Sequence, residues 1–274
     1  MSATTPNITR PAGAIGAAIP RRWRWHATDA AAVTWRNLLQ YVRIPELLVF
    51  STIQPVMFVL LFAFVFGGAI QVPGGNYINY LMPGIFVQTA VFGATATGVG
   101  LAEDLKRGMI DRFRSLPMSP AAVLAGRTFA DLIRNFFVIL LMTAVGYLIG
   151  FRFMAGLPAA FLALTLVGLF GYAFSWIEAY IGLRAPNAEV AQAAGFIWIF
   201  PLTFVSSAFV PVETMPEWLQ PIAEANPVTV AVNTIRGLVN GGATLSEFLL
   251  TLGWIAAILA VFVPLSVRTY RRIQ

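Results

Sequence analysis

Residues 157–183 read LPAAFLALTLVGLFGYAFSWIEAYIGL, and Glu178 is the single charged side chain in this run. A helix needs about 20 predominantly apolar residues to cross a hydrocarbon core about 30 Å thick. The run is long enough and apolar enough to meet this requirement. It therefore predicts a helix that crosses a lipid bilayer and indicates an integral membrane protein.

The composition of the whole chain supports this interpretation. Of the 274 residues, 58% are hydrophobic and only 11% are charged, whereas a soluble domain carries roughly 25% charged residues. The chain has too few charges to cover a globular surface. It contains no cysteine and one histidine, His26, so no disulfide framework and no metal site is predicted.

Five further apolar segments of helix length accompany the first, at residues 47–70, 77–101, 122–150, 191–210 and 248–267. Their lengths do not suggest the short alternating strands of an outer-membrane barrel. The sequence therefore predicts an all-α integral membrane protein with six transmembrane helices over residues 47–274.

The positive charges predict the orientation of these helices. The net charge is +6, and all but two of the 18 Lys and Arg residues fall in segments that share a side with both termini. The exceptions are Arg152 and Arg236. Because cytoplasmic loops carry an excess of Lys and Arg, both termini are predicted to be cytoplasmic. Charges placed beside apolar spans orient a membrane protein among lipids, so no nucleic-acid partner is predicted.

The region before the first span is predicted to have two parts. Residues 1–27 are expected to form a disordered cytoplasmic tail without a cleavable signal peptide. Residues 28–46 are expected to form an amphipathic helix at the cytoplasmic membrane interface. A soluble linker is the alternative, but it would not need an apolar stripe. The stripe recurs at helical spacing, at Trp35, Leu38, Leu39 and Val42.

The segment 211–247 is predicted to form a short helical hairpin on the outer side, between the fifth and sixth spans. The sequence TMPE at 214–217 reads as a capping box that starts a short helix. That helix should end just before Pro227, because proline disfavours helix at the preceding residue. The apolar piece 228–239 is too short to span and is expected to be re-entrant, with Arg236 at the external interface.

Ionisable residues within the predicted spans are few, and all lie near the cytoplasmic ends. Arg127, Asp131 and Arg134 lie at i, i+4 and i+7, so Asp131 can pair with both arginines on one helix face. We interpret them as local ion pairs at the cytoplasmic mouth, with a gating role as the alternative. Glu178 is expected to be satisfied by pairing or by reaching the interface. The absence of an ionisable side chain near a predicted midplane disfavours a proton- or sodium-coupled carrier and an intramembrane hydrolase.

Two phenylalanine stripes, one in the first predicted span and one in the fifth, suggest an apolar binding surface. The simplest interpretation is lipid contact or helix packing. The functional alternative is a transport path for a large apolar substrate, because aromatic walls bind without fixed hydrogen-bond geometry. The candidate path residues are Phe58, Phe62, Phe66, Phe196, Phe200 and Phe204.

The cytoplasmic loop after the second predicted span mixes apolar and charged residues. Residues 102–119 read AEDLKRGMIDRFRSLPMS and belong to a predicted hairpin at 102–121. A loop that only anchors the chain by its charge would not need this ordered mixture. Apolar side chains ringed by charge are typical of a surface that docks on a soluble partner.

This loop resembles the cytoplasmic signature of type-two ABC transporter permeases, in particular the daunorubicin-resistance-like drug export permeases. The shared pattern is an acidic–basic pair, Arg-Gly, a short apolar stretch, Arg, and then Leu-Pro with a nearby Ser. A second similar patch lies at 210–212, 215–221, 226–227 and 235–237, and the resemblance extends from residue 28 to the end. The matching loop residues are Glu103, Asp104, Lys106, Arg107, Gly108, Ile110, Asp111, Arg112, Phe113, Leu116, Pro117 and Ser119.

The resemblance implies that a separate ATP-binding-cassette ATPase, present in two copies, contacts this loop and binds ATP and Mg²⁺. It also implies a second permease, identical or related, and a path lined mainly by the first, second and fifth spans. The implied coupling residues are Glu103, Asp104, Lys106, Arg107, Gly108, Asp111, Arg112, Phe113, Leu116, Pro117 and Met118.

The chain itself is predicted to hold no ATP or other cofactor and not to be an enzyme. A P-loop needs the sequence G-x-x-x-x-G-K-[ST], and the only lysine, Lys106, lies between Leu105 and Arg107. The expected function is the permease subunit of an exporter in the bacterial plasma (inner) membrane. Its expected substrate is an amphipathic drug, such as an antibiotic, or a lipid-like compound. The alternative is an ATP-independent secondary carrier or a membrane scaffold protein.

Overall fold

A computed structural model describes residues 23–67, 70, 72, 76–109 and 119–272 of the chain. This part of the chain is helical and contains no strand, which confirms the predicted fold class at this level. In chain order the elements are α1 (Trp23–Arg43), α2 (Glu46–Leu60), the π-helical η1 (Leu61–Phe66), α3 (Tyr77–Lys106), α5 (Pro120–Leu148), α6 (Leu157–Gly182), α7 (Ala188–Phe204), the 3-10 turn η2 (Val212–Thr214), α8 (Gln220–Ala225), α9 (Pro227–Asn240) and α10 (Leu245–Arg272).

Four of these helices, α3, α5, α6 and α10, are long and apolar enough to cross a membrane, judged by length and composition. The predicted first and fifth spans form shorter apolar helices, namely α2 with η1 and α7. Each of the six predicted apolar segments therefore contains a helix. The number of times that the chain crosses the membrane stays a prediction.

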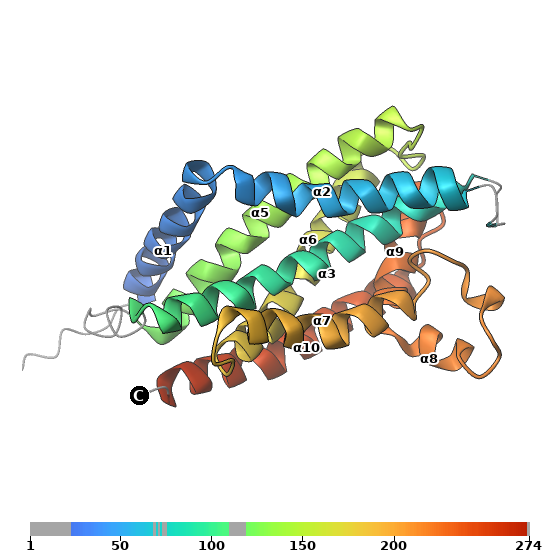
Figure 1. The fold of residues 1–274 in the computed structure, drawn as a ribbon. Coiled ribbons are helices and arrows are strands. Elements are labelled where there is room, and N and C mark those ends of the chain that lie inside the picture. The colour runs from blue at the N-terminus through green and yellow to red at the C-terminus, as the bar shows by residue number, and fades with distance from the viewer. Residues whose placement is uncertain (1–22, 68–69, 71, 73–75, 110–118, 273–274) are drawn as a thin grey trace, which may run out of the picture.

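Helix α3 lies at the centre of the bundle and packs against α2, α5, α6 and α7 (Figure 1). Its apolar side chains, such as Leu81 and Phe86, are fully buried. Glycines bring its backbone close to α6, since a Cβ added to Gly182 would lie 2.2 Å from the carbonyl oxygen of Gly98. Small residues allow such close approach between helices in lipid, and here they hold together two helices of one chain.

Helix α1 packs alongside the first half of α5 at one end of the bundle (Figure 1). It begins at Trp23, earlier than the expected start at residue 28. Its contact with α5 includes a hydrogen bond that the Thr34 hydroxyl donates to the carbonyl oxygen of Gly126 at 3.1 Å. Trp35 and Val42, two members of the predicted apolar stripe, are exposed on α1.

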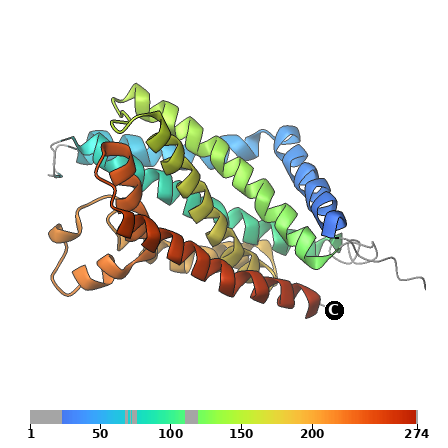
Figure 2. The same cartoon turned by 180° about the vertical axis from the view of Figure 1, so that it is seen from behind.

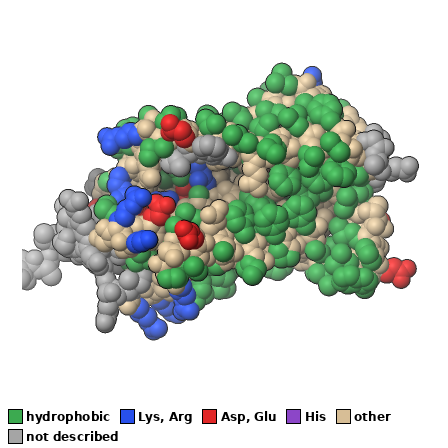
Figure 3. Space-filling view, viewed as in Figure 1, with side chains coloured by type: hydrophobic (Ala, Val, Ile, Leu, Met, Phe, Trp, Pro, Cys, Tyr) green, Lys and Arg blue, Asp and Glu red, His purple; other side chains and the backbone are tan. Residues whose placement is uncertain are grey.

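The start of α1 and the end of α10 lie at the same end of the bundle, as the two opposite views show (Figures 1 and 2). Charged side chains gather at this end in the space-filling view, and hydrophobic side chains cover most of the remaining face (Figure 3). This distribution is that of a helix bundle with an apolar belt and one strongly charged end.

The predicted outer hairpin lies at the opposite end of the bundle, and its first part differs from the prediction (Figure 1). No capping box forms at Thr214, because its hydroxyl donates to the carbonyl oxygen of Pro211 at 2.7 Å within η2. The following helix, α8, begins only at Gln220. The apolar piece 228–239 does form a helix, α9.

Helix α7 ends at Phe204, whereas the apolar run predicted a helix up to residue 210. The side-chain amide of Asn226 donates to the carbonyl oxygen of Leu202 at 2.6 Å and also to that of Val205. These carbonyls would otherwise lack partners at the end of the helix. The side chain that ends α7 therefore comes from a distant part of the sequence.

Arg236 of α9 packs against α3 within the bundle, and its predicted place at the external interface stays a prediction. Its guanidinium carbon lies 3.6 Å from the centre of the Tyr80 ring in α3. It also donates to the carbonyl oxygen of Ser207 at 2.8 Å and to Asn233 Oδ1 at 2.9 Å. These contacts join α9 to α3 and to the chain that follows α7.

Candidate functional site

A buried cluster of charged side chains joins α1, α3 and α5. Its centre is Asp131 of α5, which is 1% exposed and lies 3.4 Å from Arg127 Nε and 3.9 Å from Arg134 Nη1. Two hydroxyls donate to the same carboxylate, Thr97 of α3 at 2.6 Å and Tyr41 of α1 at 2.8 Å. The i, i+4 and i+7 spacing thus places both arginines beside one carboxylate, as the sequence indicated.

A second carboxylate, Asp104 near the end of α3, extends this cluster. It pairs with Arg36 of α1 at 3.2 Å and lies 3.8 Å from Arg127 of α5. Arg127 therefore bridges both carboxylates. We call the whole set the α1–α3–α5 network, and it consists of Arg36, Tyr41, Thr97, Asp104, Arg127, Asp131 and Arg134.

The α1–α3–α5 network carries a net positive charge, because it holds three arginines and two aspartates. Burial, followed by the neighbouring Asp131 carboxylate, raises the pKa of Tyr41 from its ordinary value of 10.0 to about 12. The phenol therefore stays protonated at physiological pH and keeps donating its hydrogen bond to Asp131.

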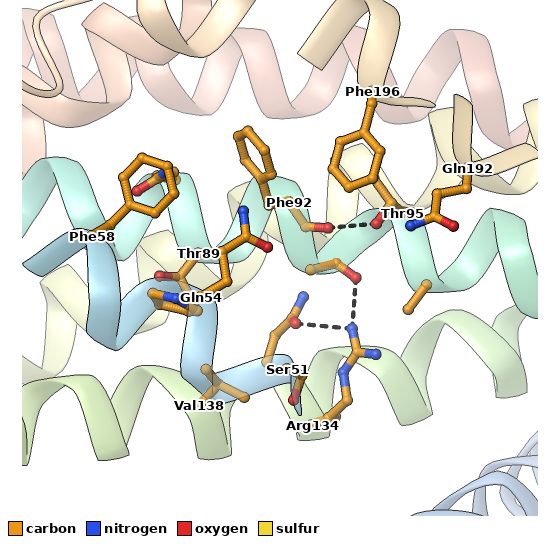
Figure 4. Close-up of a pocket in the computed structure, with 15 residues that line it drawn as sticks. Ser51, Gln54, Phe58, Thr89, Phe92, Thr95, Arg134, Val138, Gln192 and Phe196 are labelled. Carbon is orange, nitrogen blue, oxygen red and sulfur yellow. Dashed lines mark hydrogen bonds between the residues drawn. The ribbon is translucent and has the colours of Figure 1, made fainter. Parts of the chain in front are cut away.

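A cavity of about 200 Å³ lies next to this network, between α2, α3, α5 and α7. Figure 4 shows side chains from these helices converging on it, with Arg134 reaching it from α5 and Phe196 from α7. Arg134 therefore belongs both to the network and to the cavity wall. The lining residues are Ser51, Gln54, Pro55, Phe58, Gln88, Thr89, Phe92, Gly93, Thr95, Ala96, Arg134, Asn135, Val138, Gln192 and Phe196.

The two predicted phenylalanine stripes meet and form one aromatic surface beside this cavity. Phe58 of α2 and Phe204 of α7 lie with ring centroids 6.3 Å apart. Two rings outside the prediction complete the surface: Phe209 lies 4.5 Å from Phe62, and Phe92 lies 5.2 Å from Phe200. We call it the phenylalanine surface, and it consists of Phe58, Phe62, Phe66, Phe92, Phe196, Phe200, Phe204 and Phe209.

The sequence prediction missed the uncharged polar residues of the cavity. Gln54, Gln88 and Gln192 come from three different helices and lie within or beside apolar runs. Primary amides are uncommon within apolar runs, so these glutamines could have indicated a polar site from the sequence. Only the folded structure shows that the three amides line the same space.

The predicted coupling residues fall into two groups. Glu103 to Gly108 lie at the end of α3, where Arg107 pairs with Glu103 at 3.2 Å and Gly108 leaves the helix with a positive φ of 65°. They border a surface cleft whose other wall is the start of α7, at Asn187 to Glu189. The remaining predicted residues, Asp111, Arg112, Phe113, Leu116, Pro117 and Met118, lie outside the described residues.

Glu178 departs from the expectation that pairing or exposure would satisfy it. The residue is fully buried in α6, no ion pair reaches its carboxylate among the described residues, and its polar neighbour is the indole of Trp198. A Cβ added to Gly195 of α7 would lie 2.7 Å from this carboxylate. Within the described part of the chain, no group of three His, Asp or Glu side chains is placed to hold a metal ion.

Residues 28–239 match the ABC-2 type transporter family. This match covers most of the chain and includes the α1–α3–α5 network, the cavity and the phenylalanine surface. The chain belongs to this family of membrane transport proteins, which confirms the resemblance found in its cytoplasmic loop.

Several relatives are similar to this chain over most of their length. The chain is 37% identical over 239 residues to the daunorubicin resistance ABC transporter permease protein DrrB1 of Streptomyces coeruleorubidus, with 86% of this chain and 84% of that protein covered. It is 28% identical to the probable doxorubicin resistance ABC transporter permease protein DrrC of Mycobacterium tuberculosis, with 87% of both chains covered. It is also 28% identical to the putative transport permease ycf38 of Cyanophora paradoxa, with 83% and 82% covered.

Proposed function

We propose that this protein is the membrane-spanning permease subunit of an ATP-binding-cassette exporter in the bacterial plasma membrane. In this proposal the chain crosses the membrane six times with both termini in the cytoplasm. A separate ATPase, in two copies, binds ATP and Mg²⁺, and a second permease completes the transport unit. The proposed substrate is an amphipathic drug or a lipid-like compound, since two similar permeases are named for resistance to daunorubicin and doxorubicin.

The observation that carries this proposal is the connection between the end of α3 and the interior of the bundle. Asp104 lies in the last turns of α3, where the predicted cytoplasmic coupling loop (residues 102–119) begins. It pairs with arginines of α1 and α5. Arg127 then connects Asp104 to Asp131, and Arg134 connects Asp131 to the cavity. An ATPase that moves the loop would pull on α1, α3 and α5 together, and rigid elements coupled in this way transmit motion to a distant site.

The phenylalanine surface and the cavity supply the substrate side of the proposal. An aromatic wall binds flat or flexible apolar groups, and the polar cavity beside it fixes one end of an amphipathic molecule. Alternation of the cavity between the two sides of the membrane, driven by the partner ATPase, would move such a molecule outward.

Co-purification with the ATPase encoded beside this chain tests the proposal. The wild-type protein is expected to form a stable complex whose ATPase activity rises with an amphipathic substrate. Arg112→Glu combined with Leu116→Asp in the predicted docking loop is expected to abolish the complex, because it reverses a charge and removes an apolar anchor.

Arg152→Glu combined with Leu157→Asp is the matched control, since it makes the same two changes at exposed positions on the opposite end of the bundle. This control is expected to keep the complex. A wild-type protein that captures no ATPase would overturn the proposal in favour of a carrier or scaffold. Retention of the complex by the loop variant, Arg112→Glu with Leu116→Asp, would show that the loop is not the docking site.

A further inference from the structure

We propose that the cavity between α2, α3, α5 and α7 binds an uncharged hydrogen-bonding group of an amphipathic ligand, whose apolar part lies on the adjoining phenylalanine surface. The role of this ligand as transported substrate rests on the proposed function. The binding site itself follows from the chemistry of the cavity wall.

The first observation is a pair of polar side chains without partners. Gln88 and Thr89 of α3 line the cavity and are 2% and 5% exposed. Neither Gln88 Oε1 nor Thr89 Oγ1 has a hydrogen-bond partner among the described residues. Leaving such a group unpaired costs free energy of folding, so an apolar wall would make this bundle more stable. The unpartnered atoms lie within the cavity wall, and a ligand with hydrogen-bonding atoms would supply their missing partners once the two side chains turn toward it.

The second observation is the kind of polar group that the cavity presents. Gln54 of α2 and Gln192 of α7 add their amides to that of Gln88, and all three helices contribute to one wall (Figure 4). Each primary amide both donates and accepts hydrogen bonds and carries no charge. These groups match a carbonyl, a hydroxyl or an amide of the ligand.

The third observation concerns charge. Arg134 is the single charged side chain among the lining residues, and it belongs to a network with a net positive charge. An ammonium group entering this space would be repelled by the arginine and would lose part of its hydration. A carboxylate would lose part of its hydration, and the arginine with which it would pair already lies 3.9 Å from Asp131 and donates to Gly93 O. A neutral group avoids both costs.

The size of the cavity limits what it holds. A volume of about 200 Å³ corresponds to several water molecules at about 30 Å³ each, which suits one polar end group and not a whole drug-sized molecule. Phe58, Phe92 and Phe196 line the same cavity and lead directly into the phenylalanine surface. The ligand therefore has a small polar end and a larger apolar body.

A matched pair of fluorescent probes tests this inference. Dansylcadaverine carries an ammonium group at pH 7, whereas its N-acetyl derivative ends in a neutral amide on the same apolar body. Their affinities are measured by dansyl fluorescence with the full-length protein in lipid nanodiscs, after subtraction of empty nanodiscs. The wild type is expected to bind the neutral probe at least fivefold more tightly than the cationic one.

Gln88→Met keeps the length of the side chain and removes its hydrogen-bonding atoms. This variant is expected to lose about tenfold in affinity for the neutral probe, a change of about 1.4 kcal/mol, and little for the cationic probe. Gln40→Met, at an exposed position on α1 outside the cavity, is the control and should bind like the wild type.

Thermal unfolding of the same proteins separates a binding role from a structural one. Because Gln88 Oε1 has no partner in the fold, Gln88→Met is expected to keep or raise the unfolding midpoint. The inference is overturned if Gln88→Met has a lower unfolding midpoint and loses affinity for both probes. It is also overturned if this variant still prefers the neutral probe, or if the wild type does not prefer it. These binding measurements need no ATPase. The probe preference can therefore be absent although the protein forms a complex with the ATPase, and it can be present although no complex forms.

Discussion

At the scale of single residues, Asp131 is the group on which most of the buried charge depends. It accepts hydrogen bonds from Thr97 and Tyr41 and lies within 4 Å of two arginines, although it is 1% exposed. A buried carboxylate of this kind is tolerated because its partners replace the water that it has lost. The same carboxylate holds three helices together, so its removal has a mechanical as well as an electrostatic effect.

Asp131→Asn is expected to destabilise the protein by about 3–5 kcal/mol, because it leaves the buried Arg134 without a counter-charge and Arg127 with Asp104 alone. The measurement is the free energy of unfolding in detergent. Substrate-stimulated ATPase activity of the complex should fall as well, since the link between α3 and the cavity passes through this residue.

Glu103→Gln is the control for this prediction. The ion pair of Glu103 with Arg107 is exposed, and exposed pairs contribute about 0–1 kcal/mol. Equal destabilisation by the two substitutions would contradict the central role assigned to Asp131.

From the sequence, only interactions between residues of the same helix could be predicted. The spacing of Arg127, Asp131 and Arg134 was sufficient to predict their pairing, because neighbours on a helix surface follow from the helical repeat. Tyr41 and Asp104 lie on other helices, and no local pattern connects them to Asp131. Glu178 was misjudged for the same reason, since its burial is produced by glycines of α3 and α7.

At the scale of elements, the contact between α1 and α5 decides whether the charged network can form. Gly126 of α5 lets α1 approach closely, because a Cβ at this position would lie 2.6 Å from the carbonyl oxygen of Ala30 and 2.7 Å from Val33 Cβ. Arg36 and Tyr41 then reach the charges of α3 and α5 from the far part of α1. Helix α1, which is 21 residues long, is thus held at one end of the bundle by the close approach at Gly126 and by these polar contacts.

Gly126→Val is expected to push α1 away from α5 and to lower stability by about 1–3 kcal/mol, the usual cost of overpacking. Arg36 and Tyr41 would lose their partners, so α1 should also become more sensitive to proteases. Both effects are measured on the purified protein by unfolding and by limited proteolysis.

Gly253→Val in α10 makes the same substitution where no atom lies within 4 Å of the added Cβ. It is expected to change stability little and to leave the protease sensitivity of α1 unchanged. If both valines have the same effect, the change reflects a general intolerance of valine and not the α1–α5 contact.

The helices themselves were largely predictable, and their ends were not. Apolar runs of sufficient length mark helices because every backbone polar group must be satisfied internally in a lipid environment. Helix α7 is shorter than its apolar run because the amide of Asn226 accounts for its last carbonyls. The capping box predicted at Thr214 did not form, because this hydroxyl bonds back to Pro211 within η2.

At the scale of the whole molecule, one end of the bundle is charged and the other carries the α8 and α9 region (Figures 1 and 3). The positive-inside rule predicts that the charged end faces the cytoplasm. The chain lacks cysteine, so a single introduced thiol reports the side on which it lies without interference.

Ser246→Cys and Glu189→Cys place such thiols at exposed positions on opposite sides of the predicted membrane. A membrane-impermeant maleimide is expected to label the cysteine at 246 in intact cells and the cysteine at 189 only after permeabilisation. The reverse pattern would invert the orientation, and labelling of both in intact cells would contradict the six-span topology.

The sequence by itself determined that this is a helical membrane protein, where its apolar helices lie, and to which transporter family it belongs. These properties are local, since hydrophobic length, charge asymmetry and a loop signature can each be read from consecutive residues. Only the tertiary structure decided that Gln54, Gln88 and Gln192 share a cavity and that Phe92 and Phe209 join two stripes into one surface. It also decided which distant side chains end α7 and donate hydrogen bonds to Asp131. The physical reason is that two helices meet through small packing contacts, such as those at Gly126 and Gly98. Which residues make these contacts depends on how each helix is rotated and how the helices cross, and the sequence of one helix alone does not determine this.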